Sequence, residues 1–325
     1  MSITDKQEHS KNPIRVIFMG TPDFALPGLH ALADTPDFEI VGVFTQPDKP
    51  AGRGQIMTPP PIKMLSEKLS TKAGENNKNS WPIYQPVKIK TETETIKALV
   101  PDLIVVIAYG QIIPPAILDI PRFGCINVHA SLLPKYRGAA CLNAPILNGD
   151  TTTGVTIMKM DAGLDTGPIL RQAKINLNGR ETLEELHDHL AAKGAEILIP
   201  TLRDFTAGRI KPQRQDNKAA TYVRTLKKSD GRIDWTKPAK EIERLIRAYN
   251  PWPGAYTEWD GKIIKIITAA PETLLKNSRP AGTFFRHQGK LAISCGQDSL
   301  VILKLQAAGK KAMTAAEFLN GYKIK

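Results

Sequence analysis

The stretch INVHASLLPKYRGAA, residues 126–140, places two polar side chains in a run that otherwise has the composition of a buried strand. Asn127 and His129 are two positions apart, so both point to one face, about 6.6 Å apart along the strand. They lie near the strand's carboxyl end, where open parallel α/β sheets bind ligands. An amide and an imidazole there can donate hydrogen bonds to a developing oxyanion. The alternative is that the two side chains satisfy nearby loop backbone.

Apolar runs on both sides of this stretch predict its neighbours in a sheet. Strand candidates are residues 14–19, 39–46, 102–110, 125–131 and 155–161. Helical or long loop segments separate them, which favours an α/β domain with a Rossmann-like, mostly parallel sheet. A helix is expected from Thr182 to about Phe205, because Thr182 and Glu185 have the spacing of a capping box.

A second polar candidate follows the strand predicted at 155–161. In the sequence MDAGLDTGPIL, Gly163 and Gly167 allow tight turns on either side of Asp165. A carboxylate at this position could orient and stabilise a charged His129 or relay a proton through water. The alternative is that Asp165 is an Asx-turn residue before a glycine.

The hydrophobic pattern changes after residues 207–220, a basic stretch predicted to be an interdomain linker. RIDWT (232–236) is expected to be a short strand and 238–250 an amphipathic helix, followed by hairpins that turn at Asp260-Gly261 and Gln288-Gly289. Short strands at this spacing predict a small OB-like β-barrel. The predicted organisation is a catalytic domain over 1–206, the linker, and a basic domain over 221–325.

Charge and composition limit the possible functions. The net charge is +12, the sum of −1 over residues 1–200 and +13 over residues 201–325. A basic region beside a neutral one favours a nucleic-acid partner, and the alternative is a bias that aids solubility. The three cysteines lack metal-binding or disulfide spacing, which predicts a reducing cytoplasm and no metal. There is no apolar run of membrane-spanning length and no apolar core of a signal peptide at the N-terminus, so no membrane association is expected.

Several segments together resemble one family of enzymes. INVHASLLPKYRG (126–138) and GLDTG (163–167) are similar to the folate-dependent formyltransferases. GVFTQPDKPAGRG (42–54), RIDW (232–235), NPWP (250–253) and AAGKKAM (307–313) narrow the resemblance to the methionyl-tRNA formyltransferase family. The matching segments are spread over residues 14–313, nearly the whole chain.

The resemblance implies a reaction and a set of site residues. A formyl group would pass from 10-formyltetrahydrofolate to the α-amino group of methionine on initiator methionyl-tRNA, for translation initiation. Asn127, His129 and Asp165 match the family's catalytic residues. Ser131, Leu132, Leu133 and Pro134 match the segment that lines the folate site, although the proline also ends the strand.

The resemblance also implies contacts with tRNA. Residues 45–61 match a mobile loop that enters the acceptor stem, with Arg53 as its chief contact and Lys49 as a further cation. In the basic C-terminal domain the candidate phosphate contacts are Arg232, Arg244, Arg247, Lys310 and Lys311. Each could equally be a solvated surface residue. Trp235 and Trp252 could stack on bases, but packing is the simpler reading for Trp252, between two prolines.

Three other functions compete with this interpretation. A folate formyltransferase acting on a small nucleotide, such as glycinamide ribonucleotide or a nucleotide sugar, would share the INVHASLLP core but would not need the basic domain. An NAD-dependent oxidoreductase would need three glycines where MGTPDFA (19–25) has one. A non-catalytic RNA-binding protein would leave Asn127, His129 and Asp165 unexplained. A monomer is the default expectation.

Overall fold

The computed structural model describes residues 12–52, 54–72, 80–273, 279–322 and 324. The chain forms two compact units. The first comprises residues 1–137, 154–174 and 188–221, and the second comprises residues 138–153, 175–187 and 222–325. Among the described residues, no helix is both long enough and apolar enough to cross a bilayer.

A seven-stranded sheet organises the N-terminal part of the chain, with strand order β5-β2-β1-β6-β7-β8-β9. The strands are β1 (Ile14–Gly20), β2 (Phe38–Phe44), β5 (Ile83–Tyr84), β6 (Leu103–Ile107), β7 (Cys125–His129), β8 (Thr152–Lys159) and β9 (Ile169–Asn176). The pairs from β5 through β7 are parallel, and β8 runs antiparallel to β7. The predicted Rossmann-like, mostly parallel sheet is confirmed.

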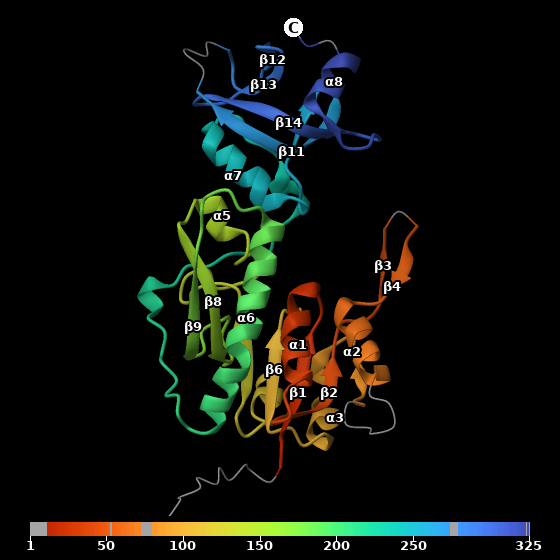
Figure 1. The fold of residues 1–325 in the computed structure, drawn as a ribbon, viewed down its shortest axis with the longest axis vertical. Coiled ribbons are helices and arrows are strands. Elements are labelled where there is room, and N and C mark those ends of the chain that lie inside the picture. Colours follow the sequence, from red (N-terminus) through yellow and green to blue (C-terminus); the bar gives the residue numbers. More distant parts are fainter. Residues whose placement is uncertain (1–11, 53, 73–79, 274–278, 323, 325) are drawn as a thin grey trace, which may run out of the picture. The chain divides into compact units, whose positions relative to one another are not determined.

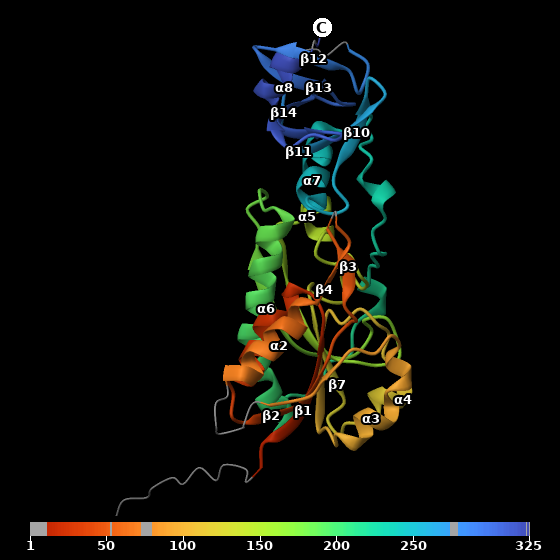
Figure 2. The ribbon, with the colours of Figure 1, turned by 90° about the vertical axis from the view of Figure 1, so that its right-hand side faces the viewer.

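Helices cover both faces of this sheet, which explains why its central strands are continuously apolar. Every residue of β6, LIVVI, is buried. The helices of this part are α1 (Leu26–Ala33), α2 (Pro61–Lys72), α3 (Thr93–Ala98), α4 (Pro115–Leu118) and α6 (Leu183–Thr206), with short 3-10 turns at Asp23–Ala25, Ile89–Thr91 and Asn217–Ala219. Figure 2 shows α2 and the part of α6 after residue 187 on one side of the strands, with α3 and α4 on the other.

The strand order reverses between β1 and β6, because β1 is followed in the chain by β2 on one side and in space by β6 on the other. The carboxyl ends of these strands are joined by a hydrogen bond from Thr21 Oγ1 to the carbonyl of Tyr109, 2.8 Å long. Such a reversal leaves a crevice at the carboxyl edge, where α/β proteins bind ligands. β7, the next strand along, ends at this same edge.

A six-stranded antiparallel sheet forms the core of the second unit, in the order β10-β11-β14-β13-β12 with β15 beside β14. The strands are β10 (Tyr256–Trp259), β11 (Lys262–Glu272), β12 (Phe284–His287), β13 (Lys290–Ser294), β14 (Ser299–Ala307) and β15 (Met313–Thr314). The helices of this unit are α5 (Ala144–Asn148), α7 (Ala239–Tyr249) and α8 (Ala315–Gly321), with a 3-10 turn at Lys228–Gly231. Figure 1 shows the strongly curved sheet with α7 and α8 beside it. The predicted barrel-like domain is confirmed, as a half-barrel.

Local signals placed most of these elements correctly. Asp260 and Gly261 both have positive φ values, 49° and 68°, as the tight turn between β10 and β11 requires. Thr314 and Glu317 cap each other's backbone amides at the start of α8. RIDWT, however, does not form a strand: Arg232 makes only an isolated bridge to Tyr256. Its apolar residue Ile233 packs into the core of the second unit without strand pairing.

Residues 207–220, predicted to be a linker, make specific contacts within the first unit. Gln213 exchanges two backbone hydrogen bonds with Ile169, of 2.7 and 2.8 Å. The domain boundaries predicted at either end of residues 207–220 remain a prediction. In the structure this segment lies along the start of β9.

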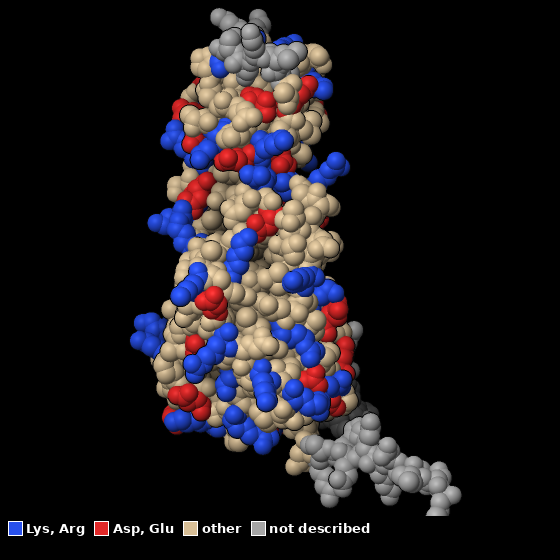
Figure 3. All heavy atoms as spheres, turned by 90° about the vertical axis from the view of Figure 1, so that its left-hand side faces the viewer, with Lys and Arg blue, Asp and Glu red and all other residues tan. Residues whose placement is uncertain are grey.

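The distribution of charge in space differs from that along the sequence. The first unit sums to +5 and the second to +7, because residues 201–221 belong to the first while two acidic segments, 138–153 and 175–187, belong to the second. On the face drawn in Figure 3, Lys and Arg are interspersed with Asp and Glu rather than gathered in one continuous band.

Candidate active site

β7 presents Asn127 and His129 at the carboxyl edge of the sheet. Asn127 lies between Val106 of β6 and Met158 of β8, and His129 lies opposite Thr156 of β8. Asn127 is partly buried, and the side chain of His129 is only 6% exposed. Strand alternation therefore places the amide and the imidazole on one face, as the sequence predicts.

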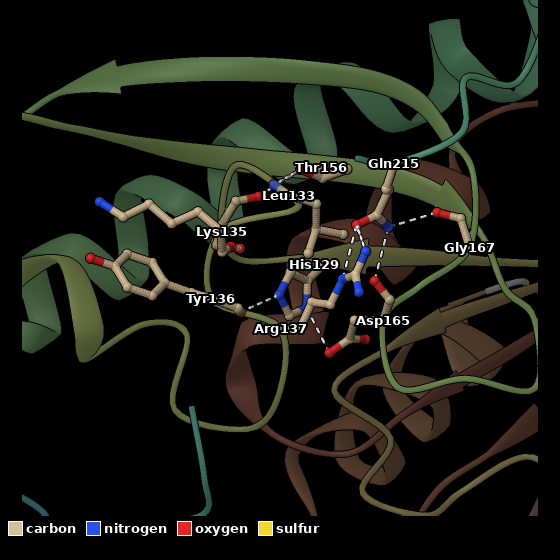
Figure 4. Close-up of polar contacts among 10 residues, drawn as sticks. His129, Leu133, Lys135, Tyr136, Arg137, Thr156, Asp165, Gly167 and Gln215 are labelled. Atoms are coloured by element: carbon tan, nitrogen blue, oxygen red, sulfur yellow. Dashed lines mark hydrogen bonds and ion pairs between the residues drawn. The ribbon is translucent and has the colours of Figure 1, made fainter. Parts of the chain in front are cut away.

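Both ring nitrogens of His129 face oxygen atoms of the first unit (Figure 4). Nε2 lies 3.0 Å from the carbonyl oxygen of Tyr136. Nδ1 lies 3.7 Å from Oδ2 of Asp165, whose side chain is 16% exposed. A carbonyl can only accept, so Nε2 carries a proton and Nδ1 is the nitrogen directed at the carboxylate. The distance of 3.7 Å is too long for a hydrogen bond, so Nδ1 and the carboxylate are close without being hydrogen-bonded.

The loop between β8 and β9 holds Asp165 in a left-handed backbone conformation, with φ of 53°. This conformation is less favourable for a residue with a Cβ than for glycine, although Asp tolerates it better than most, so contacts that fix the surrounding backbone help to hold it. Within the loop, Asp161 Oδ1 accepts hydrogen bonds from the amide of Gly163 (3.0 Å) and the hydroxyl of Thr166 (2.6 Å). Gly167 is required, because a Cβ there would overlap the carbonyl oxygen of Lys159.

The backbone of residues 131–134, the segment proposed to line the folate site, is held by a buried threonine. Thr156 Oγ1 donates to the carbonyl of Ser131 (2.6 Å) and accepts from the amide of Leu133 (3.0 Å). Gln172 Nε2 donates to Leu133 O and Thr156 Oγ1, each at 2.9 Å. Ser131 and Leu133 are buried, whereas Leu132 and Pro134 are partly exposed. Sequence reasoning did not identify Thr156 or Gln172, since nothing local distinguishes them.

Two further residues, also missed from the sequence, connect to the Asp165 loop. Arg137 is 1% exposed and donates from Nε (3.1 Å) and Nη2 (2.8 Å) to Oε1 of Gln215. Its Nη2 also donates to Asn217 Oδ1 at 2.8 Å. Gln215 Nε2 in turn donates to the carbonyls of Asp165 (2.8 Å) and Gly167 (2.7 Å). The signal that the sequence offered for Arg137 was its place before Gly138 at the end of the INVHASLLPKYRG motif. Gln215 offered none.

The segment predicted to be a mobile tRNA-binding loop contains a small hairpin, β3 (Lys49–Ala51) paired with β4 (Ile56–Thr58). Figure 1 shows it standing away from the seven-stranded sheet. Lys49 is exposed, and so is Ile56, at 72%. Arg53, the proposed chief contact, lies outside the described residues.

The base of this hairpin is firmly anchored. Asp48 accepts from Gln85 Nε2 at 2.7 Å and from Lys63 Nζ at 2.9 and 3.0 Å. These hydrogen bonds hold the pKa of the Asp48 carboxyl below its ordinary value, and the bond from Gln85 has the largest effect. Asp48 therefore stays ionised at neutral pH and ties the hairpin to α2 and β5.

The proposed phosphate contacts of the second unit fall into two groups. Arg232, Lys310 and Lys311 are exposed at the surface. Arg247 instead makes a fork-to-fork pair with Glu243, at 2.5 and 3.0 Å, and donates to the carbonyl of Glu181 at 2.7 Å. Arg247 thus ties α7 to residues 175–187, which is a structural task.

Arg244 lines a cavity of about 300 Å³ within the second unit, whose other walls include Lys240, Leu177 and Pro271. Its guanidinium lies over Gly149, where a Cβ would come within 2.6 Å of Nη1. Its Nε is buried without a hydrogen-bond partner among the described residues. Arg244 is thus the proposed cation whose donors most need an acceptor from outside.

The aromatic candidates also separate. Trp235 donates from Nε1 to Thr257 Oγ1 at 2.8 Å and packs against the core of the second unit. Trp252 is 56% exposed, so the packing interpretation is wrong for this residue. Among the described residues there is no cluster of three or more His, Cys, Asp or Glu side chains that could hold a metal ion.

Comparison with known sequences gives the geometry its context. The formyl transferase family profile matches residues 14–202, and the profile of the formyl transferase C-terminal domain matches residues 225–323. A methionyl-tRNA formyltransferase from Geotalea uraniireducens is 46% identical over 313 residues, 96% of each chain. One from Trichlorobacter lovleyi is 47% identical over 314 residues, 95% of each chain.

Solved structures share the fold at low sequence identity. HypX from Aquifex aeolicus, solved in complex with tetrahydrofolic acid, has a TM-score of 0.63 at 17% identity; the match covers 97% of this chain and 49% of HypX. A methionyl-tRNA formyltransferase from Clostridium thermocellum has a TM-score of 0.52 at 19% identity, over 89% of this chain and 99% of that one. At such identities the likeness concerns the fold alone.

Proposed function

Because this chain belongs to the methionyl-tRNA formyltransferase family of formyl transferases, we propose that it transfers a formyl group to the α-amino group of methionine on initiator methionyl-tRNA. The acceptor follows from relatives that share more than 40% of its sequence over nearly the whole chain. The product, a formylated initiator tRNA, serves translation initiation.

The proposed chemistry uses the three polar residues at the sheet edge. The neutral amine attacks the formyl carbon, forming a C–N bond, and the carbonyl oxygen gains negative charge in a tetrahedral intermediate. Asn127 donates a hydrogen bond to that oxygen, and His129 donates a second one from Nδ1 once that nitrogen has taken up the proton that the attacking amine loses. The bond to the folate nitrogen then breaks. A proton lost by the attacking amine reaches that nitrogen with the help of His129 and Asp165.

The donor is proposed to be 10-formyltetrahydrofolate, held beside Ser131, Leu132, Leu133 and Pro134. Support comes from the position of this segment directly after His129. It also comes from Thr156 and Gln172, which together make three hydrogen bonds to the backbone of Ser131 and Leu133. A rigid backbone beside the bound folate lowers the entropic cost of holding the formyl carbon in position for attack.

For the tRNA, Arg53 and Lys49 in the hairpin and Arg244 in the second unit are the proposed contacts, with Arg232, Lys310 and Lys311 as surface cations. Arg247 keeps a place in this proposal only through its support of α7. The protein is further proposed to act in the cytoplasm as a monomer. Its mass in solution, measured by light scattering after gel filtration, tests the second point.

The observation that carries the proposal is the convergence of Asn127, His129 and Asp165 at one sheet edge. The test is transfer of radiolabelled formyl from 10-formyltetrahydrofolate to methionyl-initiator tRNA, with methionyl-elongator tRNA as control. Selective labelling of the initiator is expected. Labelling of a nucleotide sugar or of glycinamide ribonucleotide, and not of tRNA, would replace the acceptor. RNA binding without transfer would overturn the catalytic assignment.

A further inference from the structure

We propose that Gln215 is a positioning residue for the reaction: it fixes the backbone of the Asp165 loop, and so holds the carboxylate at its distance from His129. The inference rests on the proposed formyl transfer and concerns a residue in the segment that its sequence marks as a linker. Figure 4 shows the side chain of Gln215 lying between Arg137 and the loop.

The orientation of the Gln215 amide is fully determined by its neighbours. Arg137 has only donors, so the oxygen of the amide must face it; the carbonyls of Asp165 and Gly167 only accept, so the nitrogen must face them. Both hydrogens of Nε2 are used, and Oε1 accepts twice. A carboxylate could serve Arg137 but could not donate to the loop, and a hydroxyl could not span both sides.

The loop needs such support at this position. The φ of 53° at Asp165 is less favourable for a side chain with a Cβ than for glycine. Within the part of the chain that the structure describes, the hydrogen bonds of the Asp161 side chain reach Gly163 and Thr166 and no residue further along the loop. Gln215 holds the carbonyls of residues 165 and 167 and thereby clamps the turn on the side that Asp161 does not reach. The direction of the Asp165 side chain follows from the backbone fixed in this way.

Two consecutive residues thus control both members of the His129–Asp165 pair. The carbonyl of Tyr136 fixes Nε2 of the imidazole, and the guanidinium of Arg137 fixes Gln215, which fixes the Asp165 loop. The spacing of 3.7 Å between Nδ1 and Oδ2 is therefore set from one short segment of backbone. The pairing of Gln213 with Ile169 delivers Gln215 to this place, two residues further on.

The experiment compares three variants of the full chain. Gln215→Ala removes both halves of the bridge. Gln215→Glu keeps the acceptor for Arg137 but sets an oxygen against the two carbonyls. Gln213→Ala is the matched control, because the Gln213 side chain is exposed and its interactions with Ile169 use only backbone atoms. For each variant, kcat and KM are measured for both substrates, and hydrogen exchange of residues 160–168 is followed by mass spectrometry.

Both Gln215 variants are expected to lose about 10–100-fold in kcat, the usual scale for a residue that orients a catalytic group, with either KM changed less than about threefold. Exchange in residues 160–168 should accelerate, and Gln213→Ala should match the parent. A kcat within about twofold of the parent in both Gln215 variants would overturn the proposal, as would an equal loss in Gln213→Ala. If the parent transfers no formyl, the proposed function fails, and the exchange data alone then decide whether Gln215 holds the loop.

Discussion

In the first unit several polar side chains in and around the site are buried and hydrogen-bonded to fixed partners, whereas in the second unit the cations proposed to bind tRNA stand mostly at the surface. His129, Arg137 and Thr156 are each at most 6% exposed, and each hydrogen-bonds within its own unit. Arg232, Lys310 and Lys311 are exposed. Buried networks fix geometry because an unpaired member is costly, while exposed charges attract a polyanion without fixing its position.

This contrast indicates how each unit responds to change. Where the protein itself supplies all the partners, removing one group disturbs its neighbours, and the effect falls on the chemical step. Where the partner is a phosphate backbone, each cation contributes separately, and its effect depends on salt.

Removal of a site donor should affect catalysis alone. Asn127→Ala and His129→Ala are each expected to lower kcat about 10²–10³-fold, because each removes one donor to the oxyanion. Filter binding should give an unchanged Kd for methionyl-tRNA. A near-parental kcat in either variant would remove that residue from the catalytic assignment, and a parallel loss of tRNA affinity would erase the contrast between the units.

Loosening the folate segment should give a smaller effect of a different kind. Thr156→Val conserves shape but leaves the amide of Leu133 and the carbonyl of Ser131 without their hydroxyl partner, at a cost of about 1–3 kcal/mol. We expect KM for the folate donor to rise about tenfold, measured by initial rates at saturating tRNA. Thr151→Val, at an exposed position near the start of β8, is the control and should leave KM unchanged.

Two arginines one turn apart on α7 sharpen the comparison inside the second unit. Arg244→Ala should reduce the slope of log affinity for tRNA against log salt by about 1, because one phosphate contact is lost. Arg247→Ala should leave that slope unchanged but lower the urea midpoint, since it frees Glu243 and the carbonyl of Glu181. If Arg247→Ala reduced the salt slope and Arg244→Ala lowered only the urea midpoint, Arg247 would be the phosphate contact and Arg244 the structural residue.

The smallest effect concerns a buried thiol in each unit. Burial raises the pKa of Cys125 and of Cys295 to about 12, so neither is appreciably ionised at pH 8. Both should resist alkylation by iodoacetamide in the native protein and react on unfolding. Mass spectrometry along a urea series then reports the first unit through Cys125 and the second through Cys295. Rapid native labelling of either thiol would contradict its burial.

The same shift gives a dependence of stability on pH. An unfolded thiol ionises above its ordinary pKa of about 8.5, whereas the folded one stays neutral to about 12. The thiol's contribution is thus fully present below pH 8.5 and is lost as the pH rises towards 12. Cys125→Ala should lose less stability than the parent between pH 8 and 10, as measured by urea unfolding.

Much of the molecule could be predicted from short-range patterns. The period of two in β7 placed Asn127 and His129 on one face, and the Asp260-Gly261 turn defined the hairpin of β10 and β11. These features depend on residues only a few positions apart, whose sterics and hydrogen bonds act whatever the rest of the chain does. RIDWT failed because its apolar residue Ile233 packs into the core while the segment's pairing with β10 stops after a single bridge at Tyr256.

The sequence by itself determined the sheet type, the pair on β7, the family and the caps, because local backbone preferences and side-chain alternation encode them. Only the tertiary structure decided what holds the site together. Gln215 reaches a loop 50 residues earlier in the chain, and Arg137 reaches Gln215 across 78 residues. Such partners are chosen by the need to satisfy buried polar groups once the chain has folded, and no pattern of neighbouring residues records that requirement.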